Sequence, residues 1–406
     1  MKTSNKYKKH ISENRSFVEI NSPLLTKNAV SIQFNVGSIH DPKTKEGLAH
    51  FLEHLILQVN NKDRAYIDRE KKGLYINGFT EKERTIYIAS SYILSAEEIT
   101  KELLKSLNFD IKKGALIKEL ETISSEILEA KSDPVNQNYN KAINECVKKF
   151  INLNIYKHDV LGTEKSIRNI TIQDVKKHID THYLNPIISV TSSVALSKDS
   201  VESIFSHIEN KGLKFKEERV EAVESSGALE STTFEFVNKN TQVFGVCLNN
   251  SERENEDLYL SVLKGYLAYN SSSICNQKMR FDKQLTYFVN NFCQIFNNFS
   301  FLFIQYDVLK KNKEKAKKEY YKIANELGQG KIDKDIFYAS KSMLLSHLRD
   351  LLTDGENLLD DFLDFNQYFK TNKSKEVDFY TIDKFIDSVE KLVVEDFTEY
   401  VKKIFK

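Results

Sequence analysis

The chain has 406 residues, which on usual domain sizes is enough for two or three domains with buried cores. Hydrophobic residues make up 40% and charged residues 29%, a globular composition that argues against a disordered or fibrous chain. Acidic and basic residues nearly cancel to a net charge of +1, so the charge balance indicates neither a nucleic acid nor a membrane surface as partner.

Cysteine usage and the amino terminus bear on the compartment. The first 17 residues are rich in Lys and Asn and contain no apolar stretch of the kind that a secretory signal needs, and no apolar run reaches membrane-spanning length. The four cysteines form no C-x-x-C pair, so neither a disulfide framework nor a thiolate zinc site is expected. We therefore expect a cytoplasmic protein. The cysteines are Cys146, Cys247, Cys275 and Cys293.

The first half of the chain mixes the two periodicities of regular secondary structure. Apolar and polar residues alternate over Val30–Val36, which is typical of a half-buried strand, whereas apolar residues recur at helical spacing over Gly47–Val59. A strand at Thr85–Ala89 and two helical patterns follow, the second ending before Asp133 and a proline. After further helices, a strand is predicted at Ile187–Val194.

The second half repeats this order of elements. A charged stretch rich in Ser, Gly and Ala at 213–232 predicts a linker between a domain at 1–212 and a domain at 233–406. Beyond it we expect a strand, a helix, a hairpin and further helices rich in Lys, Glu and Leu. Two halves of about 200 residues with this shared order suggest a duplicated α+β unit. The expected elements are a strand at Val243–Leu248, a helix around Leu258–Leu267 and a hairpin flanking Asn297 and Asn298.

The five residues His50-Phe-Leu-Glu53-His54 form an H-x-x-E-H motif, the signature of inverted zinc peptidases. Residues four apart share one face of a helix, so both imidazoles can reach one metal ion, and Glu53 lies on the same side. A catalytic zinc site needs three protein ligands and an open position for water. The pattern alone leaves two interpretations open, a metal site or a chance arrangement on an amphipathic helix.

The third ligand should be a His, Asp or Glu from another element. Glu126, in the second of the two predicted helices, is our candidate, and Glu119 lies seven residues earlier on the same helix face, where it could orient a ligand. Glu53 would then act as the general base toward a water whose pKa zinc lowers to near neutral. A glutamate on a helix of so charged a chain is more often merely solvated.

A second pair of histidines at the same spacing serves as an internal comparison. His178 and His182 are also four residues apart, but no corresponding acidic partner follows them. Histidines at this spacing are common by chance, and we interpret this pair as structural.

The chain resembles the M16 metallopeptidase family, of the pitrilysin and mitochondrial processing peptidase type, in several separated blocks. The resemblance covers most of the chain and is stronger in the first half, whereas the second half lacks a zinc motif. The blocks are Gly47 to His54, Asn77-Gly78-Phe79-Thr80 with Thr85 and Tyr87, Glu119 with Glu126, Leu161 to Glu164, and Arg280 with Tyr287.

This resemblance implies two similar α+β halves of the metallohydrolase type, each with an antiparallel-dominated sheet packed with helices. It implies one Zn²⁺ per chain and peptides that bind in extended form along the edge near Asn77, Gly78 and Phe79. It further implies that Arg280 and Tyr287 help to hold substrate. In the short subgroup of similar chain length, two subunits close a chamber, which implies a homodimer or a heterodimer with a related subunit.

The sequence departs from the family pattern at a few positions. Gly78 stands where the family usually has Ala, and Gln284 stands where it usually has Gly. These departures concern substrate binding and the Arg280 and Tyr287 assignment rather than the zinc motif.

Three readings of function follow. The first is a zinc endopeptidase acting on peptides or unfolded segments, in some form of small-peptide maturation. The second is a non-catalytic partner or scaffold subunit of the same fold, and the third is a helical protein with a coincidental motif. Zinc content separates the third reading from the others, and peptide cleavage separates the first from the second.

Overall fold

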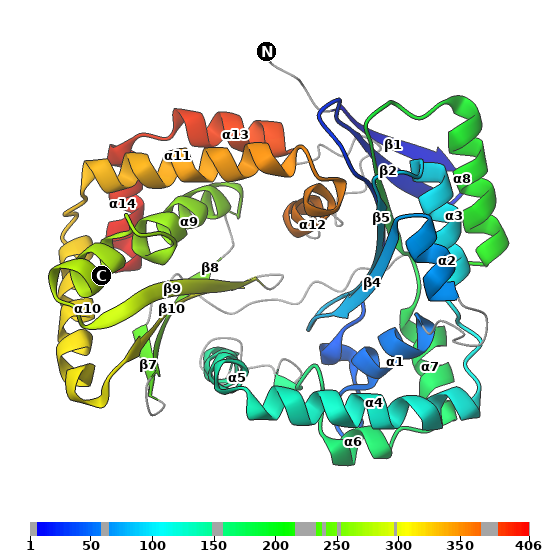
Figure 1. The fold of residues 1–406 in the computed structure, drawn as a ribbon, viewed down its shortest axis with the longest axis horizontal. Coiled ribbons are helices and arrows are strands. Elements are labelled where there is room, and N and C mark those ends of the chain that lie inside the picture. The colour runs from blue at the N-terminus through cyan, green and yellow to red at the C-terminus, as the bar shows by residue number, and fades with distance from the viewer. Residues whose placement is uncertain are drawn as a thin grey trace. The chain divides into compact units, whose positions relative to one another are not determined.

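The computed structural model describes residues 6–57, 65–147, 157–215, 233–237, 241–249, 253–295, 299–366 and 381–405. The chain divides into two compact units that interleave along the sequence (Figure 1). The sequence instead predicts two uninterrupted domains at 1–212 and 233–406, joined by a linker of which residues 216–232 lie outside the described part. The first unit is Met1–Asp133, Leu153–Glu221 and Asp350–Thr381, and the second is Pro134–Asn152, Ala222–Arg349 and Ile382–Lys406.

The first unit is built on a six-stranded sheet with the strand order β1-β2-β6-β3-β5-β4. All neighbouring strands are antiparallel except β2 and β6, which pair in parallel. The strands are β1 (Lys6–Ser12), β2 (Arg15–Asn21), β3 (Asn28–Phe34), β4 (Leu74–Thr80), β5 (Thr85–Ser91) and β6 (Ile187–Ser192).

Helices cover both faces of this sheet, with α3 on one face and α12 on the other (Figure 1). The main apolar core lies between the sheet and α1, α3, α7 and α8. The helices of the unit are η1 (Ser38–His40), α1 (Leu48–Ile56), α2 (Ala65–Lys71), α3 (Ala96–Ser106), α4 (Lys113–Ser132), α6 (Glu164–Arg168), α7 (Ile172–His182), α8 (Lys198–Lys211) and α12 (Gly355–Asn366).

The central strand β3 shows why helices are needed on both sides. Val30, Ile32 and Phe34 alternate along the strand and enter the main core, as expected for side chains that point to one face. The intervening residues are buried as well, because α12 packs against β3, β5 and β6 from the opposite face. The sequence alternation therefore identifies the strand but not its second covered face.

The second unit contains a four-stranded antiparallel sheet in the order β7-β8-β10-β9. Helix α9 packs against β9 and β10, while α13 and α14 pack against α9. The elements are β7 (Thr233–Val237), β8 (Thr241–Asn249), β9 (Thr286–Ile295), β10 (Phe299–Val308), α5 (Pro134–Cys146), α9 (Arg253–Ala268), the π-helix η5 (Asn276–Asp282), η6 (Lys310–Asn312), α10 (Lys313–Gly328), α11 (Lys334–Leu351), α13 (Ile382–Lys391) and α14 (Val394–Ile404).

The fold class expected from the sequence, α+β with mainly antiparallel sheets packed with helices, is confirmed. Each strand and helix named in the sequence analysis is present, although β3 ends at Phe34 and β6 at Ser192, two residues before the predicted ends, and the turn at Asn297 and Asn298 lies outside the described residues. Strands β1 and β2 were not anticipated. Among the helices in the described part of the chain, none is both long and apolar enough to cross a membrane.

Candidate metal centre

Helix α1 carries the H-x-x-E-H residues and is fixed firmly at its beginning. The buried Asp41 carboxylate accepts hydrogen bonds from the backbone N–H groups of Gly47 (2.8 Å) and Ala49 (2.9 Å). Gly47 has φ +92°, and a β-carbon there would lie 2.6 Å from the carbonyl oxygen of Leu161. A residue with a side chain would be strained in this conformation. These contacts set the position of the whole helix.

The apolar face of α1 then determines where the motif points. Its apolar side chains are buried in the main core, so the polar residues of the motif face α4 and β4 on the other side. His50 and Glu53 are themselves buried, and His54 is partly exposed. The buried apolar residues are Leu48, Phe51, Leu52, Leu55 and Ile56.

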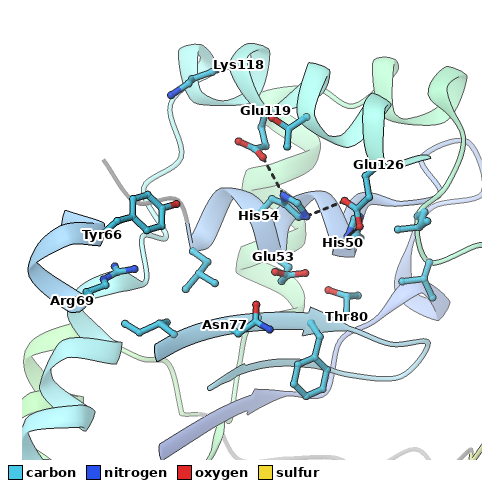
Figure 2. A pocket seen from close by; sticks show the side chains of 17 residues that line it. His50, Glu53, His54, Tyr66, Arg69, Asn77, Thr80, Lys118, Glu119 and Glu126 are labelled. Carbon is cyan, nitrogen blue, oxygen red and sulfur yellow. Dashed lines mark hydrogen bonds and ion pairs between the residues drawn. The ribbon is translucent and has the colours of Figure 1, made fainter. Parts of the chain in front are cut away.

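Helix α4 brings two carboxylates to this site, because it packs against α1 through its own buried residues Leu116, Ile123 and Ile127. Glu119 and Glu126 are seven residues apart, which is about two helical turns, so both face the histidines. Figure 2 shows the two side chains reaching from α4 to opposite sides of the His54 ring.

The ligand candidates converge closely. The Nε2 atom of His50 lies 3.5 Å from Glu126 Oε1, and the Nε2 atom of His54 lies 3.4 Å from Glu126 Oε2. Glu119 Oε1 lies 3.1 Å from the other ring nitrogen of His54, Nδ1. Nitrogen and oxygen atoms of His50, Glu53 and His54 all lie within 4.8 Å of one another, the one such group of metal-binding size among the described residues.

The separations fit a metal ion better than direct ion pairs. Ligand atoms held about 2.0–2.1 Å from a tetrahedral zinc ion are about 3.3 Å apart, close to the spacings found here. A direct charge-assisted hydrogen bond would bring nitrogen and oxygen to about 2.7–2.9 Å. With Nδ1 of His54 donating to Glu119, its Nε2 presents a lone pair toward the Glu126 carboxylate, which is favourable only with a cation or proton between them.

The electrostatics of the site agree with the need for a positive charge between the imidazoles and Glu126. Burial opposes the protonated form of His54, but hydrogen bonds with Glu119 and Glu126 outweigh it and raise the pKa of His54 to about 10. Hydrogen bonds from His50 and His54 hold the pKa of Glu126 well below its usual range. The site thus favours positive charge between the imidazoles and Glu126, which is the charge that a divalent cation supplies.

Glu53 is placed differently from Glu126. Burial raises the pKa of its carboxyl, while His54, His50 and a hydrogen bond with Thr80 act in the opposite direction. Although Glu53 is within ligand distance of the histidines, Glu126 is the residue that contacts both Nε2 atoms through its two oxygens. The residues present could therefore hold zinc through His50, His54 and Glu126, with Glu53 beside the ion.

A cleft of about 820 Å³ opens over these residues (Figure 2). Asn77, Gly78 and Phe79 of β4, the edge strand of the sheet, line it, so the structure brings three of the five predicted substrate-binding residues to the histidines. A β-carbon at Gly78 would lie 2.7 Å from Glu53 Oε1. The absence of a side chain at residue 78 is thus what gives the Glu53 carboxylate its room.

The other predicted substrate residues lie in the second unit. Arg280 belongs to η5, and its guanidinium carbon lies 4.8 Å from the ring centre of Tyr287, as in a cation–π contact. The Tyr287 side chain is 82% exposed, so the pair is available at a surface. Its role toward substrate stays a prediction.

The pair His178 and His182 forms a separate cluster of rings. The ring centres are 4.6 Å apart, and His40 adds a third ring 5.1 Å from His182. Burial lowers the pKa of His178 to about 3, so that this histidine is neutral. These three histidines do not form a group of metal-binding size, which is consistent with the structural interpretation of the pair.

Several residues of the cleft were missed from the sequence. Tyr66 and Arg69 of α2 and Lys118 of α4 line it, as does Thr80 beside Glu53. Thr80 belongs to the Asn77-Gly78-Phe79-Thr80 block that resembles the family, and this block was the signal that could have identified it. No signal in the sequence connects α2 with the motif, because the residues are separated by a segment without a periodic pattern.

Comparison with known proteins places these observations in a family. Residues 17–163 match the family described as Insulinase (Peptidase family M16), and residues 169–344 match the Peptidase M16 inactive domain. The beta subunit of the human mitochondrial-processing peptidase is 23% identical over 186 residues, covering 42% of this chain and 35% of that protein. A probable beta subunit from Schizosaccharomyces pombe is 24% identical over 195 residues, 44% of this chain and 40% of that protein. The chain thus spans little more than a third of the length of these relatives.

Solved structures share the fold over nearly the whole chain. A protease from Helicobacter pylori has a TM-score of 0.77 at 18% identity, covering 99% of this chain and 97% of that one. A peptidase M16 inactive domain from Pseudomonas fluorescens has a TM-score of 0.76 at 15% identity, covering 98% and 95%. The two family matches together take in most of the sequence, and the chain therefore belongs to the M16 peptidase family.

Proposed function

We propose that the protein is a zinc-dependent endopeptidase that hydrolyses peptides or unfolded segments, in the maturation of a small peptide or a related task. One observation carries the proposal. The Nε2 atoms of His50 and His54 lie 3.5 and 3.4 Å from the two Glu126 carboxylate oxygens in a cleft, with Glu53 beside them and an edge strand alongside.

The chain's own residues supply the proton transfers. Zinc held by His50, His54 and Glu126 would polarise the scissile carbonyl and the attacking water. Glu53 accepts the proton of that water and later donates it to the leaving amine. Its burial keeps bulk water from competing for the carboxylate, and Thr80 holds the carboxylate in place. Glu119 keeps Nδ1 of His54 as a donor, which leaves Nε2 free for the ion.

The edge strand suggests how a peptide is held. In the described part of the chain, β4 pairs with β5 alone, so the other edge of β4 presents free backbone groups next to Gly78. An extended peptide that adds a strand here makes backbone hydrogen bonds, which are largely independent of its side chains. Asn77 and Phe79 flank the position where the scissile bond meets Glu53.

The assembly and compartment are also part of the proposal. A homodimer, or a heterodimer with a related subunit, would close a chamber around the cleft, and Arg280 and Tyr287 would help to hold substrate there. The exposed, stacked arrangement of that pair supports a role at a surface. Nothing in the composition suggests a nucleic acid or a membrane as partner, and we propose a cytoplasmic location.

Metal analysis and peptide cleavage test this function together. We expect about one zinc per chain, loss of metal in His50→Ala and Glu126→Ala, and retained metal with cleavage reduced at least about a hundredfold in Glu53→Gln, because only the proton acceptor is removed. Glu129→Ala, an exposed change on the same helix as Glu126, is the control and should retain both properties.

The outcomes separate the competing functions. Normal cleavage by Glu53→Gln would remove Glu53 as the base. Zinc bound with no cleavage of any peptide, alone or with a related subunit, would favour the non-catalytic partner subunit instead. A folded protein without zinc would contradict the metal site itself.

A further inference from the structure

One end of the cleft differs in chemistry from the end that holds the histidines. Tyr66 and Arg69 project into it from α2 and Lys118 lies on its rim (Figure 2), and the apolar residues Leu57 and Ile76 also line the cleft. The site near the histidines is dominated by the carboxylates of Glu53, Glu119 and Glu126, whereas this α2 end carries cationic groups. We call the space between Tyr66, Arg69 and Ile76 the α2 subsite.

Arg69 is held in place without a carboxylate partner. Its Nη2 donates a 2.7 Å hydrogen bond to the Ser106 hydroxyl of α3. Among the described residues, no carboxylate lies within ion-pair distance of its guanidinium, and the nearby Glu102 is already paired with Lys72 at 2.8 Å. A partly buried guanidinium carries five N–H donors, of which the hydroxyl uses one. Ser106 thus leaves other N–H donors of Arg69, a residue that lines the cleft, for a further acceptor.

Tyr66 gives this group an aromatic wall. The Arg69 guanidinium carbon lies 5.9 Å from the Tyr66 ring centre, and the Tyr66 side chain is 54% exposed. A partly buried guanidinium beside an aromatic ring is less hydrated than one in solvent, and its charge-assisted hydrogen bonds to an incoming anion are correspondingly stronger. The planar donor fork matches the two oxygens of a carboxylate.

The distance between Gly78 and Ile76 along β4 indicates which residue of a bound peptide would carry that carboxylate. Ile76 and Gly78 lie on the same face of β4, the face that meets Glu53. Two residues of strand span about 7 Å, so a peptide lying along β4 with its scissile bond beside Gly78 has a side chain near Ile76 about two residues away. The side chain on this side of the scissile bond therefore enters the α2 subsite.

Building on the proposed peptidase function, we propose that Arg69 makes the α2 subsite a carboxylate-binding site that selects peptides with an acidic group about two residues from the cleaved bond. The carboxylate is either a Glu or Asp side chain or the free carboxyl terminus of a short peptide. Tyr66 and Ile76 contact the apolar part of the same residue. Lys118 adds positive charge at the rim, which attracts acidic peptides before they bind.

Peptide binding to the zinc-loaded Glu53→Gln protein tests the subsite apart from catalysis. Pairs of fluorescent peptides that differ by one Glu or Gln, moved through three residues on each side of the scissile bond, isolate the charge at each position. We expect about tenfold tighter binding of the Glu peptide at one position, as for a hydrogen bond between charged groups. The preference should fall with rising salt.

Substitutions on α2 assign the preference to Arg69. In Arg69→Gln, added to the Glu53→Gln background, the Glu and Gln peptides should bind about equally. Lys71→Gln is the matched control, because it removes the same charge from the same helix at a solvent-exposed residue near Asp68. It should keep the full preference. Arg69→Lys retains the charge but not the fork and should keep part of it, and melting temperatures check that each variant folds.

A second pair of peptides separates the two sources of carboxylate. A peptide that ends two residues past the scissile bond is compared as the free acid and as the amide. A preference for internal Glu alone assigns side chains as the ligand, and a preference for the free acid assigns the carboxyl terminus.

Two results would overturn the proposal. One is equal binding of Glu and Gln peptides at every position to the Glu53→Gln protein with Arg69 intact, together with no preference for a free terminus. The other is an unchanged preference in Arg69→Gln. Failure of the peptidase function is seen separately. In that case the zinc-loaded protein with Glu53 intact cleaves none of the peptides, while the Glu preference in binding is still measured.

Discussion

Glu119 orients one histidine of the motif, His54, for metal binding. Its carboxylate lies 3.1 Å from His54 Nδ1 and so fixes the ring with Nε2 toward Glu126. Such partners also increase the basicity of the ligand nitrogen. His50 has no equivalent partner among the described residues, since its buried Nδ1 makes no hydrogen bond. The two histidines are therefore not interchangeable.

We expect Glu119→Gln to weaken zinc binding about tenfold or more while the protein stays folded, because a neutral amide holds the ring but no longer increases its basicity. Competition with a chelator of known affinity measures the change. Glu121→Gln is the control, since Glu121 is an exposed residue two positions away on the same helix. Equal zinc affinity in both variants would show that Glu119 does not support the ligand.

Individual site residues were predicted from the sequence where they belong to a short motif or to a block shared with the family. The contact of Glu126 with both histidines agrees with its prediction as third ligand. Arg69 and Tyr66 were beyond prediction, because their relation to the motif depends on how α2 packs beside β4, and no local pattern encodes that. Asp41 was missed for a similar reason, as its hydrogen bonds reach six and eight residues ahead.

At the level of elements, the position of α1 depends on the loop before it. Asp41 is 4% exposed and accepts hydrogen bonds from the N–H groups of Gly47, the residue before α1, and Ala49 in its first turn, where no side-chain cap is present. Without these acceptors the N–H groups would be buried and unpaired. The helix that carries the motif is thus anchored by a residue outside it.

We expect Asp41→Ala to lower the free energy of unfolding of the first unit by about 2 kcal/mol and to weaken zinc binding, since the ligands on α1 lose their fixed position. Urea unfolding and metal titration measure the two effects. Asp199→Ala, at an exposed residue of α8, should change neither by more than about 0.5 kcal/mol. Unchanged zinc affinity in a destabilised Asp41→Ala protein would separate helix anchoring from the site.

Elements with a clear apolar period were predicted, whereas strands without one were missed. The long helical pattern before Asp133 corresponds to α4, although the apolar Leu128 of this helix is 70% exposed. Strands β1 and β2 were missed because β1 is an edge strand with mostly exposed residues, rich in Lys, which resembles an unstructured terminus in sequence. Their pairing is a tertiary property that local propensity does not determine.

For the whole molecule, the order of the chain is not the order of the compact units. After α9 to α11 of the second unit, the chain returns to the first, where α12 covers the second face of the sheet. The sheets and their surrounding helices are predictable from the sequence, but the position of α12 is not, because the apolar stripe of an amphipathic helix does not specify which surface it packs against. The contact that docks α12 is made at its first residues.

Gly355 begins α12 and approaches the sheet too closely for a side chain. A β-carbon there would lie 2.3 Å from both the Lys27 carbonyl oxygen and Thr191 Oγ1, while the neighbouring Glu356 carboxylate is 2.5 Å from Lys27 Nζ and accepts a 2.7 Å hydrogen bond from Ser90. The Lys27 carbonyl and the Thr191 side chain cannot move away from residue 355 without disturbing β3 and β6. The docking therefore requires glycine.

We expect Gly355→Ala to destabilise the first unit by about 1–3 kcal/mol, as in other overpacked sites, and to increase hydrogen exchange in α12, β3 and β6. Gly114→Ala in α4 is the control: a β-carbon there meets nothing within 4 Å, so the same change should be neutral or slightly stabilising. If Gly355→Ala were as stable as Gly114→Ala, with α12 equally protected, α12 would not be docked through this contact. Faster exchange confined to α12 and its strands, with α10 and α14 unaffected, would instead show that a helix encoded late in the chain is part of the first unit's core.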